Sequence, residues 1–199
     1  RTQVNALLLT ALASALSDGG GQQDIIIDLE GHGREDLFPD VDLSRSVGWH
    51  TTEFPVMLDA TGDLPQRIMQ IKEQLRQIPN KGMGYGLFKY HGSAQQRQII
   101  AAMPQAQVVF NYLGQLDASF TADSLWQLAD EPVGDLIDPD MPQTYELAIN
   151  CHVFRGELCI DINFSSARYT HATMAAFGQH LLTELGAIIA HCTSGISAV

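Results

Sequence analysis

Apolar residues recur at every third or fourth position in two stretches of the chain, which is the spacing of one face of a helix. The first stretch follows Asp63, a residue type that caps helices well, and carries Pro65 in its first turn, where proline is tolerated. The second follows Thr170, which can cap a helix in the same way. The apolar positions are Leu64, Ile68, Ile71, Leu75 and Ile78, and then Met174, Phe177, Leu181, Leu185, Ile188 and Cys192. Both patterns predict helices that pack an apolar stripe against a core.

Apolar runs between these stretches predict strands. The run 25–27 consists of isoleucines, and the segment 108–112 begins with three apolar residues and fits a strand that ends before Gly114. A capping box of Ser93 and Gln96 predicts a short helix that ends before Pro104. Helical and strand signals therefore alternate along the chain. We predict an α/β architecture, a mixed β-sheet flanked by helices.

A hairpin is predicted near the end of the chain. The segments 145–154 and 157–164 alternate apolar and polar residues, and Arg155-Gly156 between them suits a two-residue loop. In the corresponding register one face is apolar throughout. Its pairs are Leu147 with Phe164, Ile149 with Ile162, Cys151 with Ile160, and Val153 with Leu158. Cys151 and Cys159 then point to opposite faces, so we expect no disulfide between them.

Composition narrows the function classes. A formal charge of -12 on 199 residues argues against a nucleic-acid partner, because the phosphate backbone would be repelled. No apolar run is long enough to span a bilayer, so we expect no membrane association, and three cysteines do not make a disulfide framework. We therefore expect a cytoplasmic protein. Residues 117–144 are acidic and weakly patterned, with Pro132, Pro139 and Pro142, which predicts a long excursion.

Candidate chemistry begins where the isoleucine run opens into a glycine-rich loop. Side chains alternate along a strand, so Asp28 and Glu30 share one face, and Gly31 and Gly33 then let the backbone turn. Burial raises the pKa of a carboxyl group, which suits it to acid–base catalysis near neutral pH. The alternative is a structural role for these carboxylates, in a loop cap or a salt bridge.

Three further strings occur at boundaries between predicted elements. They are SRSVGWHTTEFP at 44–55, IPNKGMGYG at 78–86 and FNYLGQ at 110–115. With EGHGRE at 30–35, this ordered set resembles the epimerization domains of non-ribosomal peptide synthetases, which belong to the condensation-domain superfamily. The segment 4–16 resembles the helix that precedes these motifs in the family. Three positions depart from the family pattern: Asn5 replaces an Asp, His50 a Phe and Phe54 a Tyr.

The resemblance implies a chloramphenicol-acetyltransferase-like fold and a role in making secondary metabolites such as peptide antibiotics. In that family, the active site lies between two lobes, and one lobe carries an HHxxxDG string that this chain lacks. We therefore expect residues 1–199 to be a single C-terminal lobe that needs the N-terminal lobe and is inactive alone. The expected partners are that lobe, the neighbouring synthetase domains and a peptidyl carrier protein. We expect no directly bound cofactor or metal, because the substrate is presented on the carrier's phosphopantetheine.

The implied reaction removes the Cα proton of an aminoacyl or peptidyl thioester and returns a proton on the opposite face, which converts the L form to the D form. It needs a proton donor or acceptor on each face and hydrogen-bond donors for the enolate oxygen. By motif position, Glu30 is the catalytic carboxyl, and Asn111 and Tyr112 position the substrate or stabilise the enolate. Further residues are expected to line the substrate-binding wall, namely His32, Arg34, Trp49, Gly82, Gly84 and Tyr85. His32 and Arg34 are also expected to hold their loop in shape.

Other interpretations remain open. A condensation domain forms amide bonds in a similar chamber, and a non-catalytic lobe would only dock a carrier protein. The predicted pair His152 and Cys159 has the composition of a nucleophile with its base, but no third orienting group accompanies it. A basic cluster on the other side of the helix after Asp63, and just beyond its end, could meet a phosphate or an acidic carrier, or form a solvated face. It consists of Arg67, Lys72, Arg76 and Lys81.

Overall fold

The computed structural model describes residues 2–20, 24–119 and 140–194, and single residues at 125, 129, 131, 134 and 138. Its strands are β1 Asp24–Gly31, β2 Thr52–Asp59, β3 Val108–Gln115, β4 Leu147–Phe154 and β5 Glu157–Phe164. Its α-helices are α1 Val4–Gly20, α2 Leu64–Arg76, α3 Met83–His91, α4 Ala94–Ala101 and α5 His171–Thr193. Short 3-10 turns cover Pro79–Gly82 and Leu116–Ser119. The excursion expected at 117–144 lies largely outside the described residues.

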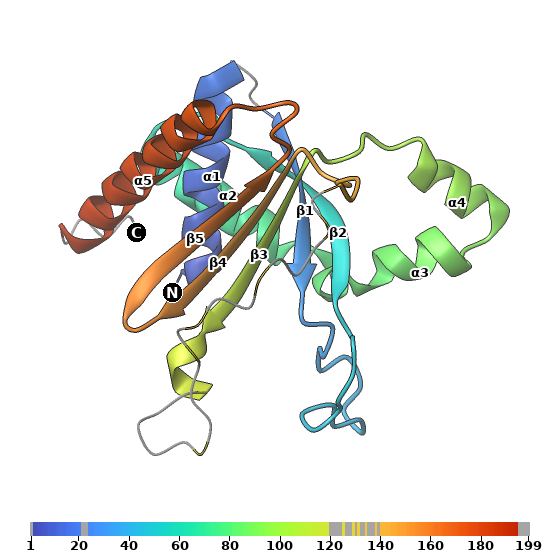
Figure 1. The fold of residues 1–199 in the computed structure, drawn as a ribbon. Coiled ribbons are helices and arrows are strands. Elements are labelled where there is room, and N and C mark those ends of the chain that lie inside the picture. Colours follow the sequence, from blue (N-terminus) through green and yellow to red (C-terminus); the bar gives the residue numbers. More distant parts are fainter. Residues whose placement is uncertain are drawn as a thin grey trace.

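The strands form one mixed sheet in the order β2-β1-β3-β4-β5 (Figure 1). The two outer pairs, β1–β2 and β4–β5, are antiparallel, whereas β1–β3 and β3–β4 are parallel. The β4–β5 register confirms every pair that the sequence predicted, from Leu147 with Phe164 to Val153 with Leu158. Cys151 and Cys159 are free cysteines on opposite faces.

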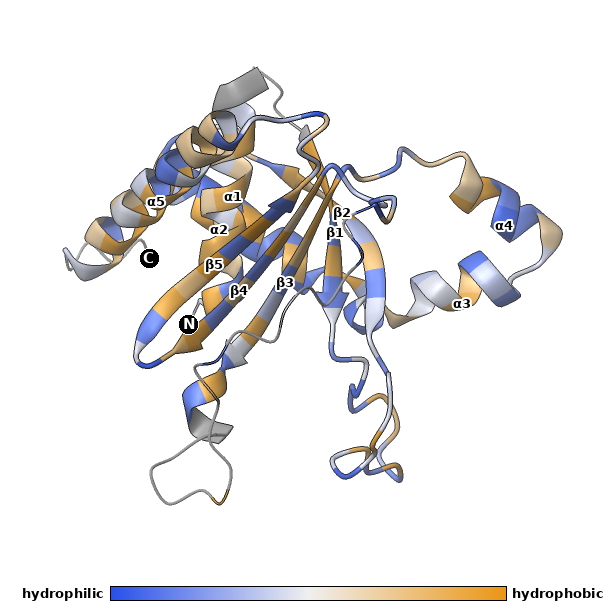
Figure 2. Cartoon of the chain, viewed as in Figure 1, coloured by the Kyte–Doolittle hydropathy of each residue, from blue (hydrophilic) through white to orange (hydrophobic). Residues whose placement is uncertain are grey.

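One face of the sheet is covered by α1, α2 and α5 (Figure 1). Helix α1 contacts both α2 and α5 as well as β1, and it is apolar along much of its length (Figure 2). Its central residues are buried, including Thr10, whose hydroxyl donates to the Ala6 carbonyl oxygen within the helix. Burying this stripe against the isoleucine strand and the α5 stripe provides the main hydrophobic contribution to the fold.

The other face of the sheet carries polar side chains. Strand alternation places Ile27 and Leu29 in the core and Asp28 and Glu30 on the opposite side. Glu30 pairs across the antiparallel β1–β2 ladder with Glu53. Among the described helices, α3 and α4 project beyond β2 instead of packing on the apolar face (Figure 1). The polar face is therefore the one available for chemistry.

The predicted helix caps are confirmed. Asp63 and Ser93 each form a capping box, with Gln66 and Gln96, and the Thr170 hydroxyl accepts from the backbone N–H of Thr173. Two details of the predicted apolar stripes were wrong. Ile78 lies beyond the end of α2, and Cys192 is exposed in the last turn of α5. No helix in the described part of the chain is long and apolar enough to cross a membrane.

Candidate active site

Two parallel strands bring the main candidate residues together. Strands β1 and β3 are adjacent, so their carboxyl ends lie at the same edge of the sheet. Glu30 lies one residue before the end of β1, and Asn111 is the fourth of the eight residues of β3. The Asn111 side-chain Nδ2 donates a 2.8 Å hydrogen bond to Glu30 Oε2. A carboxylate and an amide 81 positions apart in the sequence therefore act as one unit.

A pocket of about 780 Å³ opens at this edge of the sheet. Glu30 and Asn111 line it together, and polar groups also enter from the start of α1 and from the loop between β1 and β2. The remaining lining includes Gln3, Asn5, His32, Arg34, Glu35, Trp49, His50, Thr51, Phe54, Lys81 and Tyr112. The pocket is large enough for a slender substrate, and a carboxyl group faces it.

Burial is the main influence on the Glu30 carboxyl. It raises the pKa of Glu30, and the nearby negative charge of Glu53 raises it further. The pKa of Asp28 is also raised, chiefly by burial, although the Tyr145 hydroxyl and the Lys89 ammonium oppose this effect. A carboxyl whose pKa moves toward neutrality can both accept and return a proton, which is the property that a general acid–base group needs.

The loop between β1 and β2 is held in shape by Arg34. Its guanidinium donates to the carbonyl oxygens of Ser46, at 3.0 Å, and Gly48, at 2.9 Å. His32 Nδ1 accepts from the Arg34 backbone N–H, and His32 Nε2 lies 3.2 Å from Glu35 Oε1. The contacts of His32 and Arg34 therefore link separate parts of this loop.

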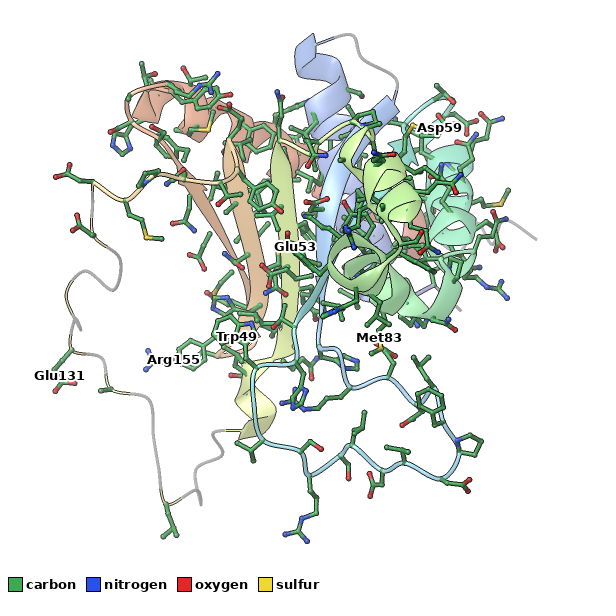
Figure 3. All side chains as sticks on the ribbon, turned by 90° about the vertical axis from the view of Figure 1, so that its right-hand side faces the viewer. Trp49, Glu53, Asp59, Met83, Glu131 and Arg155 are labelled. Atoms are coloured by element: carbon green, nitrogen blue, oxygen red, sulfur yellow. The ribbon has the colours of Figure 1, made fainter. Side chains whose placement is uncertain are left out.

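The turn after β1 depends on Gly33. Gly33 adopts φ +64, and a Cβ there would lie 1.6 Å from the His50 carbonyl oxygen. Gly31 was expected to help the chain turn, but it lies within β1 and pairs with Thr52. Trp49 is almost fully exposed on the loop, at the wall of the pocket (Figure 3).

The glycine string at 78–86 forms structure that the sequence did not predict. It makes a 3-10 turn and the first turn of α3, where Gly84 and Tyr85 lie. Gly82 has φ +80 and is packed so closely that a Cβ would lie 2.1 Å from the Phe54 ring. These three residues are absent from the pocket lining, and Lys81 lines the pocket in their place.

Tyr112 and Asn111 have different surroundings although they are neighbours in the sequence. Strand alternation turns Asn111 toward Glu30 and turns Tyr112 toward the core, where it packs partly buried. Both residues line the pocket. The geometry therefore supports a direct partnership with Glu30 for Asn111, whereas Tyr112 forms part of the wall.

An acidic side chain lies near the His152 and Cys159 pair, but His152 Nδ1 has no hydrogen-bond partner among the described residues. His152 Nδ1 lies 3.7 Å from Asp161 Oδ2, and His152 is the cross-strand partner of Cys159. However, the contact that Cys159 Sγ makes is with the Glu157 carbonyl oxygen, at 4.0 Å. Within the described ranges, no group of three or more His, Cys, Asp or Glu side chains is arranged to hold a metal ion.

Sequence reasoning missed three polar residues near the site. Glu53 faces Glu30 from β2, and Tyr145 reaches Glu53 and Asp28 from beyond the start of β4. Asn5 was noted for its departure from the family pattern. Its Oδ1 is buried at the pocket and finds no hydrogen-bond partner among the described residues. The cross-strand alternation of β1 and β2 would have revealed Glu53, had β2 been assigned as a strand.

A comparison with models of known protein families shows to which family the chain belongs. The condensation-domain model matches residues 1–199, the full length of the sequence. The chain belongs to the condensation-domain family. This condensation-family chain is 40% identical to a linear gramicidin synthase of Brevibacillus parabrevis over 100% of its own length and 3% of that protein. It is 39% identical to a mycosubtilin synthase of Bacillus subtilis, covering 97% of the chain and 7% of that protein. The chain thus spans a small part of these relatives.

Solved structures agree with this assignment. The epimerization domain from the third module of tyrocidine synthetase B superposes on 97% of this condensation-family chain, with a TM-score of 0.87 and 35% identity. The match covers 43% of that domain's chain. A starter condensation domain of the rhizomide synthetase has a TM-score of 0.61 at 16% identity, so it shows the shared fold alone. The predicted mixed sheet with flanking helices, of the chloramphenicol-acetyltransferase type, is confirmed.

Proposed function

We propose that this chain is the C-terminal lobe of an epimerization domain in a non-ribosomal peptide synthetase. In the complete domain it would convert an L-aminoacyl or peptidyl thioester, carried on phosphopantetheine, to the D form. The observation that carries this proposal is the Glu30–Asn111 pair, in which a half-buried carboxyl with a raised pKa lines a substrate-sized pocket. The 35% identity to an epimerization domain over nearly all of the chain supports it.

In this proposal Glu30 exchanges the proton on one face of the substrate's Cα. The thioester carbonyl makes that proton removable, because the resulting carbanion is an enolate. Asn111 fixes the orientation of the Glu30 carboxyl through its hydrogen bond, so that the other oxygen, Oε1, is directed to the substrate. The group for the opposite face comes from a second lobe, since the chain covers less than half of the superposed epimerization domain.

The remaining pocket residues bind and shield the substrate. Arg34 and His32 hold together the β1–β2 loop that lines part of the pocket, and Trp49 offers an exposed aromatic surface at its wall. A carrier protein would deliver the thioester at the end of its flexible arm. The proposed partners are therefore the carrier protein, the second lobe of the same domain and the adjoining synthetase domains.

The test joins this chain to its upstream segment and supplies an aminoacyl carrier protein in deuterated water. We expect deuterium at Cα together with a mixture of D and L products. Amide formation with an added acceptor, in the absence of Cα exchange, would instead assign the chain to a condensation domain. A matched reaction with the 199-residue chain alone is expected to show no exchange, because the proton group for the opposite face is missing.

A further inference from the structure

The Tyr145 hydroxyl bridges two carboxylates on the polar face of the sheet. Its Oη lies 2.6 Å from Asp28 Oδ2 on β1 and 2.6 Å from Glu53 Oε1 on β2. Tyr145 itself lies two residues before β4, and β3 separates β4 from β1 in the sheet. Its ring therefore crosses β3 to reach the two acidic strands. Figure 3 shows Glu53 at the sheet, above Trp49.

One hydroxyl serves both contacts. An O···O separation of 2.6 Å is typical of an O–H···O hydrogen bond to an ionised partner. A phenol has one proton, so the two carboxylates share it as acceptors. Asp28 is partly buried by the surrounding strands, whereas Glu53 is exposed. The hydroxyl therefore ties the exposed Glu53 carboxylate to a more buried neighbour.

Other charged groups approach the bridge from two elements. The positive charge of Lys89, on α3, lowers the pKa of Asp28, and the Lys89 ammonium lies over the ring of Tyr85. The negative charges of Asp28 and Glu53 raise the pKa of Tyr85. On the sheet, Glu30 is the cross-strand partner of Glu53. The bridge is therefore connected by electrostatics to the proposed catalytic carboxyl on one side and to α3 on the other.

The bridge determines where the Glu53 charge is held. An exposed glutamate on a strand would otherwise extend into water, where its effect on a neighbour is screened. The Tyr145 hydrogen bond instead holds the Glu53 carboxylate over the sheet, in the row that contains Asp28 and Glu30. A negative charge held beside Glu30 favours the protonated form of Glu30.

We propose that Tyr145 is a positioning residue for Glu30, because its hydroxyl is shared between Asp28 and Glu53 and so holds the Glu53 carboxylate beside Glu30. This inference rests on the proposed function, since it assigns the bridge to the acid–base group of that reaction. It adds Tyr145, from outside the motif strings, and Glu53, from the string at 44–55, to the site. The bridge raises the proton affinity of Glu30, so its carboxylate is a stronger base for removing the Cα proton.

The experiment follows the Glu30 carboxyl by carbon NMR while the pH of the labelled 199-residue chain is varied. Glu53→Gln removes the charge at an exposed position, so the fold should tolerate it. We expect this change to lower the pKa of Glu30. Tyr145→Phe should also lower it, because the released Glu53 moves into solvent. In a Glu53→Gln background, however, Tyr145→Phe should cause no additional shift.

Two controls separate this effect from general perturbation. Glu157→Gln removes an exposed carboxyl on β5, and Tyr169→Phe removes a hydroxyl before α5. Neither should move the Glu30 titration. The inference is overturned if Glu53→Gln leaves the Glu30 pKa unchanged, or if Tyr145→Phe shifts it equally in both backgrounds.

The titration needs no turnover, so its failure is distinct from a failure of the proposed reaction, which is detected by deuterium at Cα. In the complete domain, the same substitutions should move the acidic limb of the pH–rate profile for Cα exchange in the same direction as the Glu30 pKa. An unchanged profile, with the Glu30 titration shifted, would overturn the link between the bridge and catalysis.

Discussion

The Asn111 amide donates a 2.8 Å hydrogen bond to the Glu30 carboxylate at the edge of the sheet where β1 and β3 end. This bond stabilises the ionised form of Glu30, whereas burial and Glu53 stabilise the protonated form. The net effect raises the pKa of Glu30 above that of an ordinary surface glutamate. Such a group can exchange protons with a substrate without being locked in either state.

Removing the amide donor should shift this balance. We expect Asn111→Ala to raise the pKa of Glu30 further, because the hydrogen bond that favours the ionised form is lost. Carbon NMR of the Glu30 carboxyl measures the shift. Asn163→Ala, at an exposed position on β5, is the matched control. A fall in the Glu30 pKa would contradict the role given to Asn111.

The raised carboxyl pKa values also predict how stability depends on pH. In the folded state Glu30 and Asp28 bind protons more tightly than in the unfolded chain, so the folded form is favoured at low pH. That contribution is lost as pH rises from the unfolded pKa through the raised folded pKa. We therefore expect Glu30→Gln to be more stable than the native chain at neutral pH, with the difference vanishing at acidic pH. Urea unfolding at both pH values checks this, and equal stability at neutral pH would contradict it.

Two glycines of the 78–86 string should respond oppositely to the same change. Gly82→Ala is expected to destabilise the fold by about 1–3 kcal/mol, because the added Cβ overlaps the Phe54 ring at a positive φ. Gly86→Ala is the control, since a Cβ there meets nothing within 4 Å and the residue lies in α3. It should stabilise the fold by about 0.5–1 kcal/mol. Equal effects in thermal unfolding would show that Phe54 does not fix this turn.

The β1–β2 loop should open when Arg34 is replaced. Arg34→Ala removes the hydrogen bonds to the Ser46 and Gly48 carbonyl oxygens, and chymotrypsin should then cut at Phe38 and Trp49 on the order of tenfold faster. Arg45→Ala, on the same exposed loop, serves as the control for the loss of a positive charge. In the complete domain, the Arg34 variant should also bind the carrier-linked substrate more weakly. Unchanged cleavage would remove Arg34 from loop ordering.

Local features of the fold followed from the sequence to different degrees. The β4–β5 register was predicted in full, because a two-residue loop and strict alternation leave one pairing that keeps Leu147 and Ile149 in the core. Asp63 and Thr170 placed the helix starts for a similar reason, since capping is a short-range interaction. Helix α3 was not predicted, because its glycines and aromatic residues give no apolar periodicity.

The site depended on contacts between distant parts of the chain. Family resemblance brought Glu30 and Asn111 together as candidates, but no local pattern links two residues on different strands. Tyr145 was read as the first residue of a strand, so its reach across β3 to Asp28 could not be foreseen. Such contacts depend on strand order, which alternation does not specify.

The most direct test of the account compares Cα deuterium exchange by the complete domain with and without Glu30→Gln, using Glu157→Gln as the matched control. General acid–base catalysis contributes roughly 10²- to 10⁴-fold to a rate, so we expect a loss of that order for the Glu30 variant and none for the control. Circular dichroism and carrier-protein binding should remain unchanged. Exchange at the native rate in the Glu30 variant would contradict the assignment of Glu30 as the acid–base group.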